Sequence, residues 1–359
     1  MVAVPAFLGG EYNGGGDVVR ILLTSILCKS GLMTHVLDLV RALGTRHVEV
    51  GLAFRTKNLK ERLDYQEWLA GLGESPVFYY TTTDDLALLY RRYQPQLIHA
   101  HSPNCFHCSA SVSMRYGLPL IITLHSTFPV EKWCPLTAVV ARWIIAVGPA
   151  QARVVPSFQN KTVIIPNGID LERFRPKKHL FRRRLRLCWF GRVHGEMAAG
   201  VEGLNRALAL VRAQGARLDA HFLGSAPQIP KDQFIDLGWL DDPVPSLQRS
   251  QIAFGHGRAL REAMACGNIG FLVGAGYGGQ VTGELLHSFQ HLDAFPEYRL
   301  PKASPELLAA DILELLDNPQ SMAGFQKEAR QIALEHFGLR AMVDATLNLY
   351  EQALYGRTG

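Results

Sequence analysis

The segment Gly255-His-Gly257-Arg-Ala-Leu-Arg-Glu262-Ala-Met-Ala-Cys-Gly267 combines a glycine-rich turn with a short amphipathic helix that carries an acid. Its first glycines predict a turn that opens a short helix, and Gly267 is placed to end that helix. Backbone amides at a helix start attract phosphate, and Glu262 lies about two turns in, within reach of a ribose hydroxyl. The stretch predicts a nucleotide diphosphate at Gly255, Gly257 and Arg258, with its ribose on Glu262. A plain helix start with a solvent-facing glutamate is the alternative.

The residues around this helix support a ligand site. Arg258 lies one turn before Glu262, so it can either pair with that carboxylate or reach phosphate. Asn268 to Val273 is predicted to be a buried strand, and Gly274 to Gly279 a second glycine-rich loop. Two such loops flanking one helix and one strand allow a backbone to approach an anionic ligand closely.

Length and composition limit the class of protein. The 359 residues are enough for two domains, and 48% hydrophobic against 19% charged residues supports a sizeable core. The chain lacks an apolar run of the roughly 18 residues that a membrane helix needs. Six scattered cysteines favour free thiols in a reducing cytosol over a disulfide framework. The net charge of +5 is too modest to require nucleic acid, so we expect a cytoplasmic protein without a nucleic-acid partner.

Apolar runs alternate with helical patterns along the whole chain, which predicts parallel sheets covered on both faces. The fold class is therefore α/β, with two doubly wound, Rossmann-like domains that face a central cleft, the default site for a ligand. Strands are predicted at 19–24, 48–54, 77–80, 97–100, 119–124, 144–147, 185–190, 218–222, 233–237 and 251–254.

The same pattern gives the domain boundaries. We expect a disordered leader at 1–18, an N-terminal acceptor-side domain at 19–168, and a basic linker at 169–186. A C-terminal nucleotide-sugar-binding domain follows at 187–333, and the segment 334–359 is predicted to be a helix that packs back on the N-terminal domain. Eight Lys or Arg residues and no acid lie between Arg173 and Arg186. They form either a solvated connector or a peripheral contact with anionic lipid at the inner membrane face.

Several landmarks together resemble the retaining glycosyltransferases of family 4, the group 1 transferases of the GT-B fold. They occur in the order of that family and span about residues 19 to 355: Gly31-Leu-Met-Thr-His35, Leu97-Ile-His-Ala-His101, Ile122-Thr-Leu-His125, Ile165-Pro-Asn-Gly-Ile-Asp170, Phe190-Gly-Arg192 and Glu262-Ala-Met-Ala-Cys-Gly267.

The chain also departs from this family in two places. Phe254 stands where the family motif has its first glutamate, and residues 192–200 contain no lysine, although one usually follows the arginine of the phosphate loop. The Gly-x-Gly-Arg form at 255–258, followed by Gly-Tyr-x-Gly at 276–279, resembles a branch of the family with a shortened glutamate motif.

The resemblance implies a metal-independent, retaining transfer of a sugar from a nucleotide-sugar donor to a glycan or lipid-linked acceptor, in the biosynthesis of cell-surface polysaccharide. No cofactor is required. The catalytic residues would be His125, Arg192 and Glu262. The nucleotide would be bound by Gly31, Gly191, Arg192, Gly255, Gly257, Arg258 and Glu262.

We expect no metal site, because the chain contains no Asp-x-Asp pair to hold Mg²⁺ on a diphosphate. The cluster His99, His101, Cys105, His107 and Cys108 has only one Cys-x-x-Cys pair, which makes a structural zinc site a minor alternative.

Two other functions stay open. Phe254 and the missing lysine are compatible with a catalytically impaired protein that binds a nucleotide or nucleotide sugar without transfer. A nucleotide-sugar epimerase on the same two-domain plan is the third possibility.

Overall fold

The computed structural model describes residues 18–356, apart from 29, 47, 57–64, 67–68, 70–71, 178–183, 194, 227 and 290. The leader expected at 1–18 therefore lies, except for Val18, outside the described residues. The chain divides into two compact units. Unit 1 is Met1–Gly168 together with Leu339–Gly359, and unit 2 is Ile169–Gly338.

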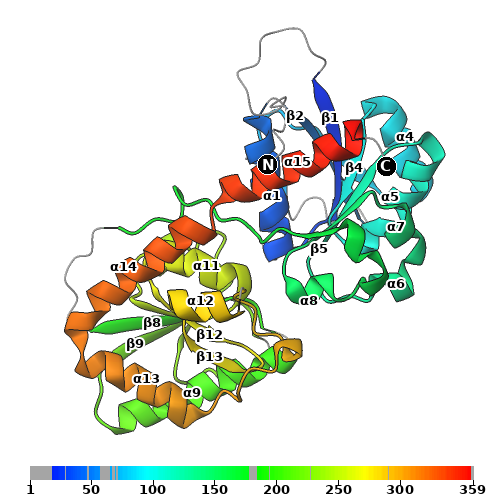
Figure 1. The fold of residues 1–359 in the computed structure, drawn as a ribbon. Helices are drawn as coiled ribbons and strands as arrows, with labels where there is room; N and C mark the ends of the chain where they lie inside the picture. Colours follow the sequence, from blue (N-terminus) through cyan, green and yellow to red (C-terminus); the bar gives the residue numbers. More distant parts are fainter. Residues whose placement is uncertain are drawn as a thin grey trace. The chain divides into compact units, whose positions relative to one another are not determined.

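Unit 1 is built on a seven-stranded sheet with the order β3-β2-β1-β4-β5-β6-β7 (Figure 1). All of these strands pair in parallel. Their bounds are β1 Val19–Ile26, β2 Val48–Arg55, β3 Val77–Tyr80, β4 Leu97–Ala100, β5 Leu120–Leu124, β6 Trp143–Ala146 and β7 Thr162–Ile164.

Each face of this sheet supports its own hydrophobic core, because successive side chains of a strand point to opposite faces. Ile21 and Leu23 of β1 belong to the core under α1 and α15, whereas Leu22 belongs to the core under α4, α5 and α7. The helices are α1 Gly31–Gly44, α4 Thr83–Tyr93, α5 Pro103–Tyr116, α6 Val130–Trp133, α7 Pro135–Val140, α8 Pro149–Ala152 and α15 Leu339–Tyr355, with a 3-10 helix, η1, at Pro156–Lys161.

Unit 2 is built on a six-stranded sheet with the order β10-β9-β8-β11-β12-β13. Its strands are β8 Leu185–Phe190, β9 Leu218–Leu223, β10 Ile235–Gly238, β11 Ile252–Gly255, β12 Ile269–Val273 and β13 Tyr277–Gln280. Figure 1 shows α9 and α13 on one face of this sheet and α11 and α14 on the other. The helices are α9 Ala198–Ala213, α10 Val244–Leu247, α11 Gly257–Ala265, α12 Gly283–Phe289, α13 Pro305–Asp317 and α14 Pro319–His336, with 3-10 helices η2 Gly195–Met197 and η3 Pro296–Tyr298.

The two sheets confirm the predicted α/β class with two Rossmann-like halves. The six cysteines are free, as expected. Within the described part of the chain, each helix is too short or too polar to cross a lipid bilayer.

Two local predictions are wrong. Residues 277–279, expected in a loop, belong to β13, which pairs antiparallel with β12. Tyr277 explains the strand, because its ring is buried and stacks on Phe271 while its hydroxyl hydrogen-bonds Asp311. The single helix expected within 334–359 is instead divided between the end of α14 and α15. The break lies at Phe337 and Gly338, where the Phe337 carbonyl accepts the amide of Ile169 at 2.7 Å.

The described part of the basic stretch carries less unpaired charge than the sequence suggests. Arg173 pairs with Asp242 at 3.1 Å, and Arg186, which is part of β8, pairs with Asp219 at 3.4 Å. Arg175 lies 3.8 Å from Glu172. Residues 178–183 of this stretch are outside the described residues.

We predict that Tyr350→Phe destabilises unit 1 by about 1–3 kcal/mol, the cost of leaving a buried polar group without its partner. The Tyr350 hydroxyl lies 2.7 Å from His99 Nδ1, and both side chains are buried. Tyr355→Phe on the same helix is the matched control, because Tyr355 is 66% exposed. Urea unfolding measures both free energies. Equal stability of the two variants would mean that this bond does not hold α15 to the sheet.

Candidate functional site

The strand order of unit 2 reverses at β8, which has β9 on one side and β11 on the other. In open parallel sheets, ligands bind outside the carboxyl ends of the strands at such a reversal. The predicted phosphate-binding residues follow these ends directly, because Gly191 comes after β8 and Gly257 after β11. The fold therefore brings the two predicted glycine segments together at one edge.

Glycine backbones pack closely at this edge. A Cβ on Gly224, after β9, would lie 2.0 Å from the carbonyl oxygen of Gly191, and a Cβ on Gly255 would lie 2.7 Å from the carbonyl oxygen of Phe190. Gly224 also has a φ of +149°, which disfavours other residues. The turns after β8, β9 and β11 are therefore fixed against one another by backbone alone.

Two amides that the sequence assigns to phosphate already have partners. The Gly257 amide donates to the Leu292 carbonyl, and the Gly191 amide donates to the Leu223 carbonyl at 2.9 Å. These two glycines consequently shape the edge, and their own N–H groups are engaged within the protein. The first turn of α11 still presents the positive end of the helix dipole at this edge.

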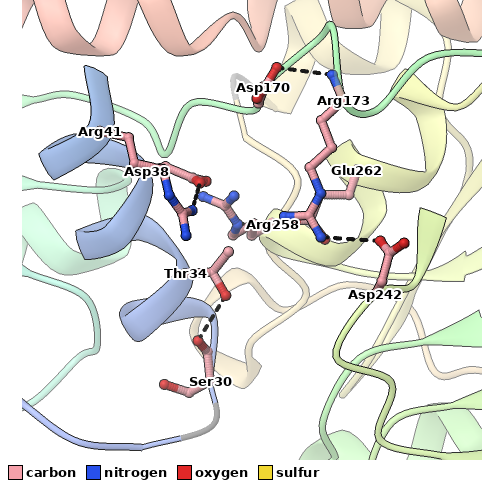
Figure 2. Close-up of polar contacts among 9 residues, drawn as sticks. All are labelled: Ser30, Thr34, Asp38, Arg41, Asp170, Arg173, Asp242, Arg258 and Glu262. Carbon is pink, nitrogen blue, oxygen red and sulfur yellow. Dashed lines mark hydrogen bonds and ion pairs between the residues drawn. The ribbon is translucent and has the colours of Figure 1, made fainter. Parts of the chain in front are cut away.

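Glu262 is buried and paired with Arg258. The Arg258 Nε donates to Glu262 Oε1 at 2.7 Å, with side-chain exposures of 7% and 8% (Figure 2). The sequence left open whether Arg258 pairs with Glu262 or reaches a phosphate, and in this structure it pairs with Glu262. The helical spacing of four residues places both groups on the same face of α11. Glu262 is thus held at a fixed orientation in the second turn of α11.

A second pair of opposite charges lies beside the start of α11. Burial raises the pKa of the Asp293 carboxyl, and the charge of Arg261 opposes that rise. Burial likewise lowers the pKa of Arg261 from its ordinary value, which the Asp293 charge opposes. Asp293 Oδ1 would lie 3.1 Å from a Cβ on Gly257, so the carboxyl sits next to the helix start. These two residues went unnoticed in the sequence, because their proximity depends on how the segment after α12 folds back.

Arg192 is the exposed cation of this edge. It follows Gly191 in the turn after β8, and the Val193 amide anchors that turn by donating to the Ser225 carbonyl at 2.8 Å. Arg192 has no hydrogen-bond partner among the described residues. Its side chain is therefore available to an anion at the carboxyl ends of β8 and β9.

Phe254, in the place of the family's first glutamate, is a core residue. It is fully buried in β11 and stacks on Phe271 with ring centroids 5.0 Å apart. The Phe254 side chain fills the hydrophobic core beneath the sheet, so position 254 provides no acid for binding a ligand.

The strand order of unit 1 reverses at β1, between β2 and β4. Gly31 is the exposed first residue of α1, which follows β1. The Thr34 hydroxyl donates to the Ser30 carbonyl at 3.2 Å within the first helical turn, as Figure 2 shows. His101 follows β4 and His125 follows β5, so the predicted residues of unit 1 also lie at the carboxyl ends of neighbouring strands.

His125 is part of a histidine cluster. His101 Nδ1 lies 3.3 Å from His125 Nε2, and the ring of His35 meets that of His125 edge-on with centroids 4.7 Å apart. His35 comes from the second turn of α1 and is buried, as is His101, whereas His125 is half-buried. The sequence alone assigns no role to His35. The only hint in the sequence is that His35 lies four residues after Gly31, which places it one helical turn beyond the start of α1.

His99 supports the cluster from the core side. Its Nδ1 lies 2.7 Å from the Tyr350 hydroxyl and its Nε2 lies 2.7 Å from Thr123 Oγ1. Burial lowers the pKa of His99 to about 3, and burial also lowers the pKa of His101 well below its usual range. Both rings are therefore neutral at physiological pH.

The Cys-x-x-Cys pair is separate from this cluster. Cys105 is buried, and burial raises the pKa of its thiol to about 12, while Thr83 donates to Cys108 Sγ at 3.4 Å. His107 points away on the exposed side of α5. Among the described residues, the five side chains considered for a zinc site do not converge on one point: His99, His101, Cys105, His107 and Cys108.

Residues 29–173 match the model of Glycosyltransferase Family 4. The resemblance to family 4 glycosyltransferases is confirmed. No curated protein sequence matches the chain significantly.

Solved structures share the fold across nearly the whole chain. Anabaena HepE in complex with UDP and glucose is 16% identical, with 93% of this chain and 99% of that chain covered and a TM-score of 0.70. A glycosyltransferase from Rickettsia africae is 13% identical, with 95% and 100% covered and a TM-score of 0.69. A putative UDP-N-acetylglucosamine 2-epimerase from Listeria monocytogenes is 12% identical, with 95% and 98% covered and a TM-score of 0.61. At these identities the likeness shows the GT-B fold.

We predict that Arg258→Ala destabilises unit 2 by about 3–5 kcal/mol, because it leaves the buried Glu262 carboxylate without its counter-charge. Arg173→Ala removes the exposed pair with Asp242 and should cost no more than about 1 kcal/mol. Chemical denaturation of both variants measures the difference. Similar losses in the two variants would contradict a buried, energetically coupled pair at α11.

We also predict that Gly224→Ala costs about 2–4 kcal/mol, since it combines an unfavourable φ with a backbone clash. Gly215→Ala is the matched control, because Gly215 also has a positive φ, of +84°, but open space around its Cβ. It should lose about 1–2 kcal/mol. If both variants unfold at the same denaturant concentration, the close approach of Gly224 to Gly191 does not contribute.

Proposed function

We propose that this protein is a retaining glycosyltransferase, which moves a sugar from a nucleotide-sugar donor to a glycan or lipid-linked acceptor. The observation that carries the proposal is Glu262, an acid fixed by Arg258 behind a glycine-lined strand edge. The family match at residues 29–173 supports the same activity. In this proposal unit 2 binds the donor, and unit 1 contributes the acceptor side.

The nucleotide part follows from the chemistry of the edge. A carboxylate accepts hydrogen bonds from ribose hydroxyls, and an exposed arginine binds a diphosphate through charge-assisted hydrogen bonds. We assign these roles to Glu262 and Arg192. HepE has been solved with UDP and with UDP-glucose, which makes uridine diphosphate sugars the first donors to test.

The transfer step breaks the bond between the anomeric carbon and the diphosphate oxygen, the acceptor oxygen forms the new bond to that carbon, and the acceptor's hydroxyl proton passes to the departing diphosphate. Negative charge grows on the departing diphosphate, so a cation and helix dipole placed there stabilise the transition state. Arg192 and the first turn of α11 supply both, and we propose that the diphosphate needs no divalent cation. His125 is proposed to hydrogen-bond the donor sugar from unit 1.

We further propose that the acceptor is met at the cytoplasmic face of the membrane, in the synthesis of a cell-surface polysaccharide. The ion pairs of Arg173 and Arg186 reduce the positive charge available for lipid headgroups. A peripheral contact would have to draw on the other basic residues of the segment 173–186.

A second candidate function is a protein that binds the nucleotide sugar without transfer. Phe254 favours it, because the position of the family's first glutamate is filled by a buried aromatic ring. The two candidates share the nucleotide site and differ only in turnover.

A screen of nucleotide sugars separates them. Calorimetry with UDP, GDP and ADP identifies the nucleotide, and mass spectrometry then follows donor consumption with and without acceptors. Release of the nucleotide together with a product that keeps the donor's anomeric configuration, observed by NMR, supports retaining transfer. Binding without turnover supports the second candidate, and a changed sugar without any acceptor would indicate an epimerase. Failure to bind any nucleotide would overturn both candidates.

We predict that Arg192→Ala weakens nucleotide binding by about 1.5–3 kcal/mol, the value of a hydrogen bond to a charged group. The control is Arg217→Ala, because Arg217 is also exposed but precedes β9, at the amino ends of the strands. Calorimetric titration with the nucleotide identified above gives both affinities. Unchanged affinity in Arg192→Ala removes Arg192 from the proposed role.

A further inference from the structure

We infer that His35, His101 and His125 of unit 1 form a binding site for a divalent transition-metal ion of the zinc class. The three residues come from α1 and from the turns after β4 and β5, so three separate elements converge on one point. This inference does not depend on the proposed transfer activity.

The spacing of the nitrogens suits such an ion. One ring nitrogen from each histidine lies within 4.8 Å of the other two. In a tetrahedral site with Zn–N bonds of about 2.0–2.1 Å, neighbouring nitrogens are about 3.4 Å apart. The His101 Nδ1 to His125 Nε2 distance of 3.3 Å already has this value.

His101 gives a second, independent indication of a ligand. Its side chain is fully buried, and its Nε2 has no hydrogen-bond partner among the described residues. A buried polar nitrogen without a partner is costly, and native proteins rarely keep one. An ion bound at His101 Nε2 would give this nitrogen a partner, whereas an ion bound at His101 Nδ1 would be shared with His125 Nε2.

The neighbouring His99 shows by contrast what a structural histidine looks like in this fold. Both of its ring nitrogens have hydroxyl partners, Tyr350 and Thr123, so it has no nitrogen left for an ion. Its ring lies 4.0 Å from that of His101, centroid to centroid, and so limits the orientations that His101 can adopt. Such outer contacts orient metal-binding histidines.

The chemistry of the donors sets the class of ion. Imidazole nitrogen suits zinc, copper, nickel and iron, whereas magnesium and calcium prefer oxygen. Three protein ligands leave a fourth position for water or an oxygen of a substrate, the arrangement of open zinc sites. His125 is half-buried, which places that fourth position on the solvent side.

The test is a metal titration of the full-length protein after treatment with a chelator and in the absence of nucleotide. Zn²⁺ is titrated in competition with a chromophoric chelator, and Co²⁺ is followed by its visible absorption, which reports tetrahedral geometry. We expect about one ion per chain and tetrahedral Co²⁺ bands. The variants His101→Ala and His125→Ala should each lower the zinc affinity by about 100-fold or more, because each removes one of three ligands.

His107→Ala is the control, since His107 is exposed on α5 and should leave binding unchanged. Because His101 is fully buried, its variant is first checked for folding by circular dichroism. If it does not fold, the half-buried His125 variant decides the result alone. Absence of zinc binding to the native chain, or native affinity in His125→Ala, would overturn the inference.

Zinc and the role proposed for His125 in transfer exclude each other, because both need the same imidazole. In a preparation that turns over donor, zinc should therefore inhibit transfer by native protein and by His107→Ala alike. A protein that binds zinc with the predicted variant pattern, but turns over no donor in its zinc-free form, would contradict the proposed transfer and leave the metal site supported.

Discussion

The reversal of strand order at β1 and at β8 determines where the functional side chains of both units can meet. On the two sides of the central strand, the crossover connections run in opposite directions. The turns that follow the central strands therefore border an open crevice at the edge formed by the carboxyl ends of the strands. In unit 2 that edge collects Gly191, Gly224 and Gly255, and in unit 1 it collects His101 and His125. Chemistry-bearing residues that are far apart in the sequence become neighbours because of this topology.

The strands could be predicted from the sequence because they are buried on both faces. Continuous apolar runs such as Leu97 to Ala100 and Leu185 to Phe190 are bounded by turn residues, and their predicted limits agree with β4 and β8. β13 could not be predicted, since four residues with two glycines give no period. The strand depends on Tyr277 packing against Phe271, a contact between segments. The division between α14 and α15 similarly depends on a bond from Ile169 to Phe337.

The candidate site was predictable in its residues and less so in their interactions. The helical spacing of Arg258 and Glu262 allowed a pair, but burial of both groups decides that the pair forms. Gly257 looked like a phosphate ligand because a local pattern cannot show that the Leu292 carbonyl reaches its amide. His35 was overlooked for the same reason. Its neighbours, His101 and His125, follow strands that lie far along the chain.

We propose that a nucleotide diphosphate binds at the carboxyl ends of the strands of unit 2, where the strand order reverses. A crystal structure of the protein with UDP would show whether it does. We expect the diphosphate beside Arg192 and the first turn of α11, with the ribose hydroxyls within hydrogen-bonding distance of Glu262. Nucleotide bound at the amino ends of the strands would contradict this binding site. A crystal soaked at saturating UDP that shows no nucleotide density near Glu262 would contradict it as well.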